Sequence, residues 1–328
     1  MDAVQPATVP PVRDAAADRL RPGMTSTAGK RRLSRRRRFS RARGKGAAYR
    51  ARVGNAASPH RARQGDRPER SATFQGGGVG GDALIWRVER ACAAAWPARV
   101  AHRESGWMVG VSGGGSRRSN SASATAPDVA LDMPTLHAIQ RRYRDADQPT
   151  IVRLTDATQA AGALLDAAGF AAPEGRTRTL LRLPAGHTPP GAVIVTAAPD
   201  AAWRAARQRL SPSSAADHAA IPSRVTAPAA FARVMEGAHS VAIGYAALTD
   251  GIAVIESVAT DPAARRRGHA SAIVAALLGW AARGGAAHVA LQVEEANAAA
   301  RALYDQLGFA TDLYGYHYRR SARCPTFA

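Results

Sequence analysis

The sequence predicts an α/β protein in which strands and helices alternate through two related units behind a long arginine-rich segment. Three observations support this fold class. Apolar runs of strand length alternate with runs of helical periodicity from about residue 82 onward. The octet Ala163–Phe170 recurs at Ala302–Phe309 with the same spacing, which indicates a duplication. Finally, the apolar run at 252–259 leads into a basic turn, Arg265–Ala270, that opens an apolar helical run.

The N-terminal segment differs sharply in composition from the rest of the chain. Residues 1–80 carry 19 of the 45 basic side chains but 5 of the 25 acidic ones, with few large apolar residues. Such a segment cannot bury enough surface to offset its ordering entropy, so residues 1–81 are predicted to be a disordered tail ending in a glycine linker. A nucleic-acid-binding tail is the alternative. Aromatic residues that could stack on bases are almost absent here, so the solvated tail is favoured.

Cysteine and histidine usage limits the possible chemistry. Cys92 and Cys324 are isolated, which argues against a metal site or a disulfide framework and favours a reducing, cytoplasmic setting. The nine histidines form no pairs at helical spacing, so no metal is expected. The longest apolar stretch, Ala272–Ala282, is too short to span a bilayer, and no membrane partner is expected.

The first unit is predicted to cover residues 82–184. The predicted elements are helices at 83–95, 131–143 and 157–168, and strands at 106–111, 117–122, 150–154 and 179–183. Three consecutive glycines, Gly113–Gly115, mark a turn between the first two strands. The proline-rich stretch 184–191 is predicted to be a linker.

The second unit is predicted to cover residues 192–322. Its predicted elements are strands at 192–197, 231–235, 240–248, 252–259 and 288–293, two strands flanking Gly315, and helices at 200–210, 268–282 and 297–307. Asp200 is placed to cap its helix. Asp250-Gly251 is a strong hairpin signal between two of the strands.

The turn Arg265–Ala270 is predicted to bind an anion. A strand followed by a glycine-containing turn and a helix start directs free backbone N–H groups at whatever lies beyond the helix terminus. Gly268 allows an anion to approach the backbone closely. The neighbouring arginines add charge-assisted hydrogen bonds. A phosphate-bearing ligand is therefore expected at this turn.

Two motifs in order resemble the GNAT superfamily, the Gcn5-related N-acetyltransferases. Arg265-x-x-Gly268-x-Ala270 is similar to the pyrophosphate loop of that family, and Asn297-x-x-Ala300-x-x-Leu303-Tyr304-x-x-x-Gly308-Phe309 is similar to its following helix. The resemblance covers roughly residues 192–320. It implies a mixed, mostly antiparallel sheet flanked by helices.

The upstream unit is similar to the degenerate first half of tandem GNAT proteins. Trp96-Pro97, Gly106-Trp107, Arg118-x-Asn120-Ser121 and the first octet carry this resemblance. No anion-binding turn precedes the first octet, and Leu165 stands where the second octet has Tyr304. Two tandem GNAT-like units with one acetyl-CoA site, in 192–322, are therefore expected.

The resemblance implies a set of site residues. The cofactor-binding residues would be Val258, Ala259 and Thr260 along pantetheine, Arg265, Arg266, Arg267, Gly268, His269, Ala270 and Ser271 around the pyrophosphate, and Asn297 on the cofactor arm. His269 is expected to face solvent rather than to catalyse.

Tyr304 occupies the position of the family's general acid, where a phenol would protonate the leaving thiolate. Some family members place a glutamate five residues before the motif asparagine, and that position here is Gln292. Glu256 is the replacement candidate for the general base, with Glu294 and Glu295 as further candidates. Surface carboxylates with water taking the proton are an equal alternative.

The expected activity is transfer of an acetyl group from acetyl-CoA to an amine by direct attack on the thioester. The sequence contains no serine or cysteine nucleophile motif, which favours direct transfer over a covalent acyl-enzyme intermediate. A non-catalytic acyl-CoA-binding regulatory module is the alternative, because Gln292 stands where some family members have a glutamate. The acceptor, a small-molecule or protein amine, and the oligomeric state are left open.

Overall fold

The computed structural model describes residues 79–184, 192–212 and 216–322. The predicted tail up to residue 78 and the linker segment 185–191 lie outside the described residues and stay predictions. Helix α1 (Val79–Ala95) begins inside the glycine run that the sequence assigns to a linker. Glycine in a helix costs about 1 kcal/mol relative to alanine. Burial of Val88, Ala91 and Ala95 on the sheet offsets this cost.

The remaining elements form one mixed sheet with helices packed on it, which confirms the predicted fold class. The strands are β1 (Val100–Glu104), β2 (Trp107–Val111), β3 (Ala122–Ala124), β4 (Ile151–Thr155), β5 (Glu174–Arg182), β6 (Val193–Thr196), β7 (Ala229–Glu236), β8 (His239–Thr249), β9 (Ile252–Thr260), β10 (His288–Glu294) and β11 (Thr311–Arg320). The helices are α2 (Met133–Asp145), α3 (Gly162–Ala167), α4 (Ala201–Leu210), α5 (Ala216–Ala220), α6 (His269–Arg283) and α7 (Ala298–Gln306), with short 3-10 turns at Asp156–Ala161, Ile221–Arg224 and Pro262–Ala264.

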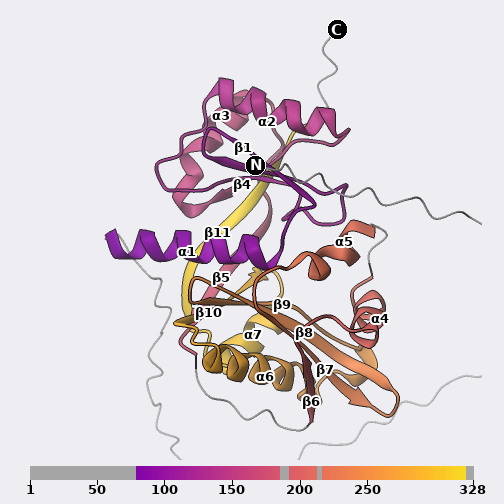
Figure 1. Cartoon of the computed structure of the whole chain (residues 1–328). Helices are drawn as coiled ribbons and strands as arrows, with labels where there is room; N and C mark the ends of the chain where they lie inside the picture. Colours follow the sequence, from indigo (N-terminus) through magenta and orange to yellow (C-terminus); the bar gives the residue numbers. More distant parts are fainter. Residues whose placement is uncertain (1–78, 185–191, 213–215, 323–328) are drawn as a thin grey trace, which may run out of the picture. The chain divides into compact units, whose positions relative to one another are not determined.

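Strands from the two predicted units are interleaved in this sheet. Its order is β1-β2-β3-β4-β11-β5-β10-β9-β8-β7-β6. Strand β5 of the first unit therefore lies between β10 and β11 of the second, and β11 pairs with β4 of the first (Figure 1). Among the described strands, β3–β4 and β9–β10 are parallel and the other pairs are antiparallel. Each unit thus supplies a strand that the other needs to complete its hydrogen bonding.

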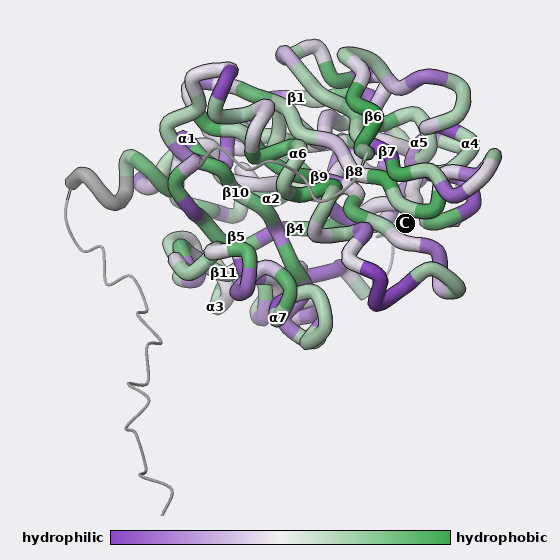
Figure 2. Tube along the Cα trace, turned by 90° about the horizontal axis from the view of Figure 1, so that it is seen from below, coloured by the Kyte–Doolittle hydropathy of each residue, from purple (hydrophilic) through white to green (hydrophobic). Residues whose placement is uncertain are grey.

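Helices α1 and α6 cover opposite faces of the strand β9. Side chains alternate along a strand, so neighbours point to opposite faces. Ala253 and Ile255 share a core with α6, whereas Ile252 and Val254 share a core with α1. The hydrophobic colour of β9 in Figure 2 fits a strand buried on both faces. A helix from the first unit therefore packs on the sheet of the second.

The two octets adopt the same local structure. Each helix ends at a glycine with positive φ, 75° at Gly169 and 81° at Gly308. In each, the N–H of the following phenylalanine bonds the carbonyl five residues back, at 3.0 Å from Phe170 and 2.9 Å from Phe309. This is the Schellman arrangement, which glycine at the helix end favours.

Local signals at two further sites are confirmed. The Asp200 side chain accepts the Trp203 N–H at 2.7 Å and so caps α4. Asp250 and Gly251 both have positive φ, 49° and 74°, as a two-residue hairpin between β8 and β9 requires.

The strand predicted at 117–122 is wrong, because most of it is a turn and β3 begins at Ala122. The Asn120 N–H bonds the Arg117 carbonyl at 3.1 Å, and the Asn120 side chain bonds Ser112 and Ser116. Such side-chain bonds offer the backbone an alternative to a ladder. The turn leaves the side chain of Arg118 free to reach the site described below.

The helix predicted at 157–168 is divided into a 3-10 turn and the short α3. Thr158 breaks it with a non-helical φ of −117°, while its hydroxyl accepts the Thr155 N–H at 2.9 Å. Strand β1 was not predicted, because its sequence lacks the apolar alternation of a half-buried strand. It is largely exposed at the edge of the sheet.

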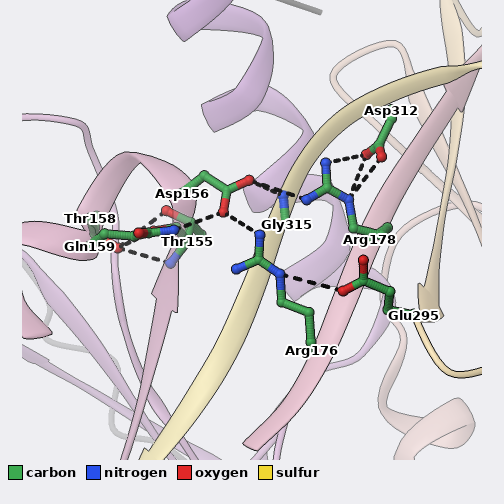
Figure 3. Close-up of polar contacts among 9 residues, drawn as sticks. All are labelled: Thr155, Asp156, Thr158, Gln159, Arg176, Arg178, Glu295, Asp312 and Gly315. Atoms are coloured by element: carbon green, nitrogen blue, oxygen red, sulfur yellow. Dashed lines mark hydrogen bonds and ion pairs between the residues drawn. The ribbon is translucent and has the colours of Figure 1, made fainter. Parts of the chain in front are cut away.

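The two strands predicted around Gly315 are one strand, β11, with irregular register. The Gly315 N–H donates to the Asp156 carboxylate at 2.6 Å instead of to the ladder. Figure 3 shows Asp156 reaching this N–H together with Arg176 and Arg178 of β5. A Cβ at Gly315 would meet the guanidinium ends of Arg178 and Arg176, and these flexible side chains would have to shift to accommodate it.

Candidate functional site

Strands β9 and β10 separate halfway along their length. They pair in parallel from Ile252 with His288 to Ile255 with Leu291. Beyond this point β9 continues to Thr260 and β10 to Glu294 without further pairing between them. The opening begins at Glu256 on one strand and Gln292 on the other. It leaves backbone groups of β9 free for an added ligand strand.

A β-bulge redirects β9 at the start of this opening. Ile243 pairs with Ala259 and Tyr245 with Glu256, so two residues of β9 oppose Gly244 of β8. Ser257 within the bulge has a positive φ of 54°. A bulge bends its strand and re-aims the side chains that follow it. Gly244 accommodates the crowding here, because a Cβ would lie 2.6 Å from Ile273 Cγ2 of α6.

A cavity of about 780 Å³ lies between the end of β9, the start of α6 and one side of α7. Most of the residues predicted to bind the cofactor line it. They are Val258, Ala259, Thr260, Arg265, Arg266, Gly268, His269, Ala270 and Ser271. Tyr304 lines the same cavity from α7, while Arg267 and Asn297 do not line it. Groups up to 46 positions apart in sequence are thereby brought to one space.

The loop before α6 is shaped for an anion. Gly268 caps the helix with φ 80°, and a Cβ there would meet no atom within 4 Å. Arg266 also has a positive φ, 65°. The first bond across the cap runs from the Ala272 N–H to the Gly268 carbonyl, so the earlier N–H groups have no helical acceptor. These groups and the helix dipole favour negative charge beside Gly268.

Glu236 organises the outer side of this loop. Its carboxylate accepts from Arg267 Nη1 at 3.0 and 3.2 Å and contacts His269 Nε2 at 2.8 Å. The hydrogen bond from His269, with the Arg267 contacts, lowers the pKa of Glu236. The expectation that His269 faces solvent is wrong, since 15% of its side chain is exposed and the ring is bound to Glu236. Arg267 is likewise held by Glu236 rather than turned to the cavity.

Asn297 caps α7. Its Oδ1 accepts the Ala300 N–H at 3.1 Å, and the residue is exposed. Asparagine is one of the residues that favour this position directly before a helix. Its contact with a cofactor arm stays a prediction.

Tyr304 is buried on α7, with 9% of its surface exposed, and its ring meets Phe309 edge-on at 5.9 Å. Burial, with a smaller contribution from the nearby charge of Glu256, raises the pKa of Tyr304 to about 12. The phenol is therefore protonated at neutral pH and can donate a proton into the cavity.

Glu256 is buried, with 6% of its side chain exposed, and is paired with Arg118. Arg118 Nη2 donates to Glu256 Oε2 at 2.7 Å, and Arg118 Nη1 donates to Gln292 Oε1 at 2.6 Å. Tyr316 also donates to Gln292 Oε1, at 3.1 Å. The sequence indicated the segment around Arg118 as part of a resemblance but gave no sign that it reaches Glu256. That contact depends on how the first unit packs on the second.

A second cavity, of about 630 Å³, adjoins Glu256. It is lined by the glycine turn Gly113–Gly115, by Trp96 and Arg118, by Gln292 and Glu294 of β10, and by tyrosines of β11. Glu256 thus lines one cavity while its charge acts on Tyr304, which lines the other.

The further candidates for the base lie at the surface. Glu294 pairs with Arg117 at 3.5 Å and is 64% exposed. Glu295 pairs with Arg176 at 3.7 Å, at the edge of the Asp156 cluster in Figure 3. Of the carboxylates considered, Glu256 is the buried one beside the opening.

Comparisons with known proteins place the chain in a family. The family described as "Probable histone acetyltransferase Rv0428c C-terminal" matches residues 83–320. The chain belongs to this family and is a member of the GNAT superfamily. No curated protein matches the sequence.

Solved GNAT structures resemble this chain in fold. A GCN5-related N-acetyltransferase from Kribbella flavida is 17% identical over 73% of this chain and 96% of its own, with a TM-score of 0.55. One from Sphaerobacter thermophilus is 21% identical over 57% of this chain and 65% of its own, with a TM-score of 0.43. A tandem GNAT protein from the clavulanic acid biosynthesis pathway is 13% identical over 63% of this chain and 76% of its own, with a TM-score of 0.48. The fold assignment rests on the first of these.

Neither a metal site nor a membrane-spanning helix is found in the described part of the chain. No described group of three or more His, Cys, Asp or Glu residues is arranged to hold a metal ion. None of the described helices is long and apolar enough to cross a membrane.

Proposed function

We propose that this GNAT protein transfers an acetyl group from acetyl-CoA to an amine by direct attack on the thioester. Family membership supports acyl transfer as the type of reaction. The observation that carries the proposal is that one cavity combines the start of α6 with its free N–H groups, the end of β9 that does not pair with β10, and the buried phenol of Tyr304.

The residues divide the donor between them. The N–H groups beside Gly268, with Arg265 and Arg266, would hold the pyrophosphate. Val258, Ala259 and Thr260 would pair through their main chain with the pantetheine amides, as an added strand would. Arg267 and His269 would act indirectly, by fixing the loop through Glu236.

The acceptor would approach Glu256 from the 630 Å³ cavity. Its ammonium gives one proton to Glu256, directly or through a water, and the resulting amine attacks the thioester carbon. The C–S bond breaks as the N–C bond forms, and Tyr304 protonates the leaving thiolate. The second proton lost from nitrogen replaces the one that Tyr304 donated. The raised pKa of Tyr304 keeps its proton available for this step.

The family description suggests one acceptor class to test first. It refers to a histone acetyltransferase, so a lysine amine in a basic peptide belongs in the acceptor panel beside small amines. A cytoplasmic location is also proposed, supported by the free thiol of Cys92.

The alternative, a non-catalytic acyl-CoA-binding module, is favoured by one observation. Gln292 stands where some family members have a glutamate, and its Oε1 is occupied by Arg118 and Tyr316. CoA release measured with the amine panel separates the two functions. Tight acetyl-CoA binding without turnover on any amine would support the module.

Two matched pairs of variants test the assignment. Tyr304→Phe is expected to lower kcat by about 10²-fold, while the buried Tyr143→Phe, in the first unit, lowers stability without lowering kcat. Gly268→Glu is expected to abolish acetyl-CoA binding in calorimetry. Gly285→Glu, with similar positive φ and equally open space, should leave it unchanged. Retained affinity in Gly268→Glu, or full turnover in Tyr304→Phe, would contradict the corresponding role.

A further inference from the structure

We propose that Arg118, supplied by the first unit, is a positioning residue that holds Glu256 in the orientation needed for a general base. This inference rests on the proposed function. It assigns a part in the reaction to a unit that has no cofactor loop of its own.

The geometry around Arg118 is fixed from three sides. Its guanidinium bonds Glu256 Oε2 and Gln292 Oε1, one on each of the separated strands. Its third contact is the Trp96 ring, whose centroid lies 4.3 Å from Arg118 Cζ. The indole N–H of Trp96 in turn donates to Ser116 Oγ at 3.0 Å. A side chain held this firmly can fix a carboxylate as well as neutralise it.

The contact uses one oxygen of Glu256 and leaves the other without a partner. Glu256 Oε1 is buried and has no hydrogen-bond partner among the described residues. Gln292 Nε2 beside it is in the same condition. Unsatisfied buried polar atoms are costly, so such a pair at a cavity indicates groups that a ligand completes. Arg118 therefore anchors one carboxylate oxygen while the other remains available to an acceptor amine.

Gln292 also explains why Glu256 rather than residue 292 takes the base role. The Gln292 side-chain carbonyl oxygen accepts from both Arg118 and Tyr316. Because the amide is neutral, residue 292 does not add a second buried negative charge beside Glu256. Arg118 is thus left with a single carboxylate partner. Burial alone would lower the pKa of Arg118, but Glu256 raises it more, so the guanidinium stays charged.

Other titratable groups also surround this pair. Those that act on Glu256 or Arg118 are Glu89 and Cys92 of α1, Arg207 of α4, His218 of α5, Tyr245 of β8, Tyr304 of α7, and Tyr316 and Tyr318 of β11. None of these groups hydrogen-bonds Glu256, so Arg118 is the partner whose removal changes its geometry most directly.

Arg117 supplies a matched control. It is adjacent in sequence and lines the same cavity, yet it pairs at 3.5 Å with Glu174 and Glu294, both exposed. Removing Arg117 changes the charge of the cavity by the same amount as removing Arg118. A difference between the two variants therefore reports the contact with Glu256.

The test compares Arg118→Ala, Arg118→Lys and Arg117→Ala, each alone and with Glu256→Gln. Arg118→Ala is expected to lower kcat/KM for the amine by about 10²-fold, with KM for acetyl-CoA unchanged. Arg118→Lys should restore most of the rate. The double variant Arg118→Ala with Glu256→Gln should have the same kcat/KM as Glu256→Gln alone.

A second measurement does not depend on turnover. Crystal structures of the wild type and of both arginine variants report the position of the Glu256 carboxylate, with melting temperatures as a check on folding. The expected result is a carboxylate displaced from its wild-type position in Arg118→Ala and unmoved in Arg117→Ala. An equal displacement in the two variants, or an undiminished Arg118→Ala loss in the Glu256→Gln background, would overturn the positioning role. A wild type that acetylates no amine, together with the expected displacement in Arg118→Ala, would instead refute the proposed function alone.

Discussion

Replacing Glu89 with glutamine should destabilise the whole described part of the chain, because this carboxylate fastens α1 to the sheet. Glu89 accepts from Arg153 of β4 at 2.5 and 2.9 Å and from the Tyr314 hydroxyl of β11. Glu89 is 8% exposed and Arg153 5%. Arg153 also stacks on the Tyr316 ring at 3.7 Å. The substitution would leave a buried guanidinium without its counter-charge.

The magnitude follows from this burial. Breaking a buried ion pair by removing one partner costs about 3–5 kcal/mol, which corresponds to a melting temperature about 6–20 °C lower for a unit of this size. The control is Glu104→Gln, which breaks a half-exposed pair with Arg142 and should cost about 1 kcal/mol or less. Replacing both partners with apolar residues, Glu89→Leu with Arg153→Met, should recover part of the loss.

The loss should also depend on pH in a defined direction. Burial raises the pKa of the Glu89 carboxyl, but the Arg153 charge and the hydrogen bonds outweigh it, so the net pKa lies below its ordinary value. A lowered pKa in the folded state contributes stability above the unfolded value, about 4.3. That contribution disappears as the pH falls through the folded value. The stabilities of wild type and Glu89→Gln should therefore converge in acid.

Thermal unfolding followed by circular dichroism at pH 7 and at stepwise lower pH measures both effects. A Glu89→Gln protein within about 2 °C of wild type at pH 7 would refute the reasoning, since that difference is worth about 1 kcal/mol or less at this size. Loss of stability as large in Glu104→Gln would refute it equally. A difference that stays constant down to pH 3 would show that the charge of Glu89 is not what stabilises α1.

Two further predictions concern glycine contacts. Gly244→Ala should lower the free energy of unfolding in denaturant by about 1–3 kcal/mol, because its Cβ would lie 2.6 Å from the rigid, buried Ile273. The control Gly162→Ala, at a position with open space and helical φ, should lower it by nothing. Equal stability of the two variants would contradict the crowding at Gly244. Asp156→Ala should cost about 1–3 kcal/mol by leaving the Gly315 N–H without an acceptor, whereas Asp156→Asn, which keeps an oxygen there, should lose less. Matching losses for Ala and Asn would show that this hydrogen bond is not the source.

The features that local sequence controls could be predicted well. The helix ends at Gly169 and Gly308 need a positive φ that glycine adopts without strain, and both octets form the same turn. The turn that ends in Gly268 and the start of α6 at His269 also follow from local sequence, because a glycine with positive φ and a helix start are local properties. The functional roles of these residues remain predictions.

Two of the errors have different physical causes. The turn at 117–120 forms because the Asn120 side chain accepts the Ser112 N–H and donates to the Ser116 carbonyl, both nearby in sequence, so its residues form no ladder. The single strand β11 passes Gly315 because Asp156, from the other unit, accepts the N–H that the ladder omits. No window of residues around Gly315 contains that information.

The sequence alone determined the superfamily and the turn that precedes α6, because each motif depends on residues within one helix or one turn. The tertiary structure decided how the two units share the site. Only when β5 inserts between β10 and β11, and α1 packs on β9, does Arg118 come within 2.7 Å of Glu256. Hydrogen-bond pairing between strands places residues 138 positions apart in contact, and pairing of that range is set by the whole sheet rather than by the residues themselves.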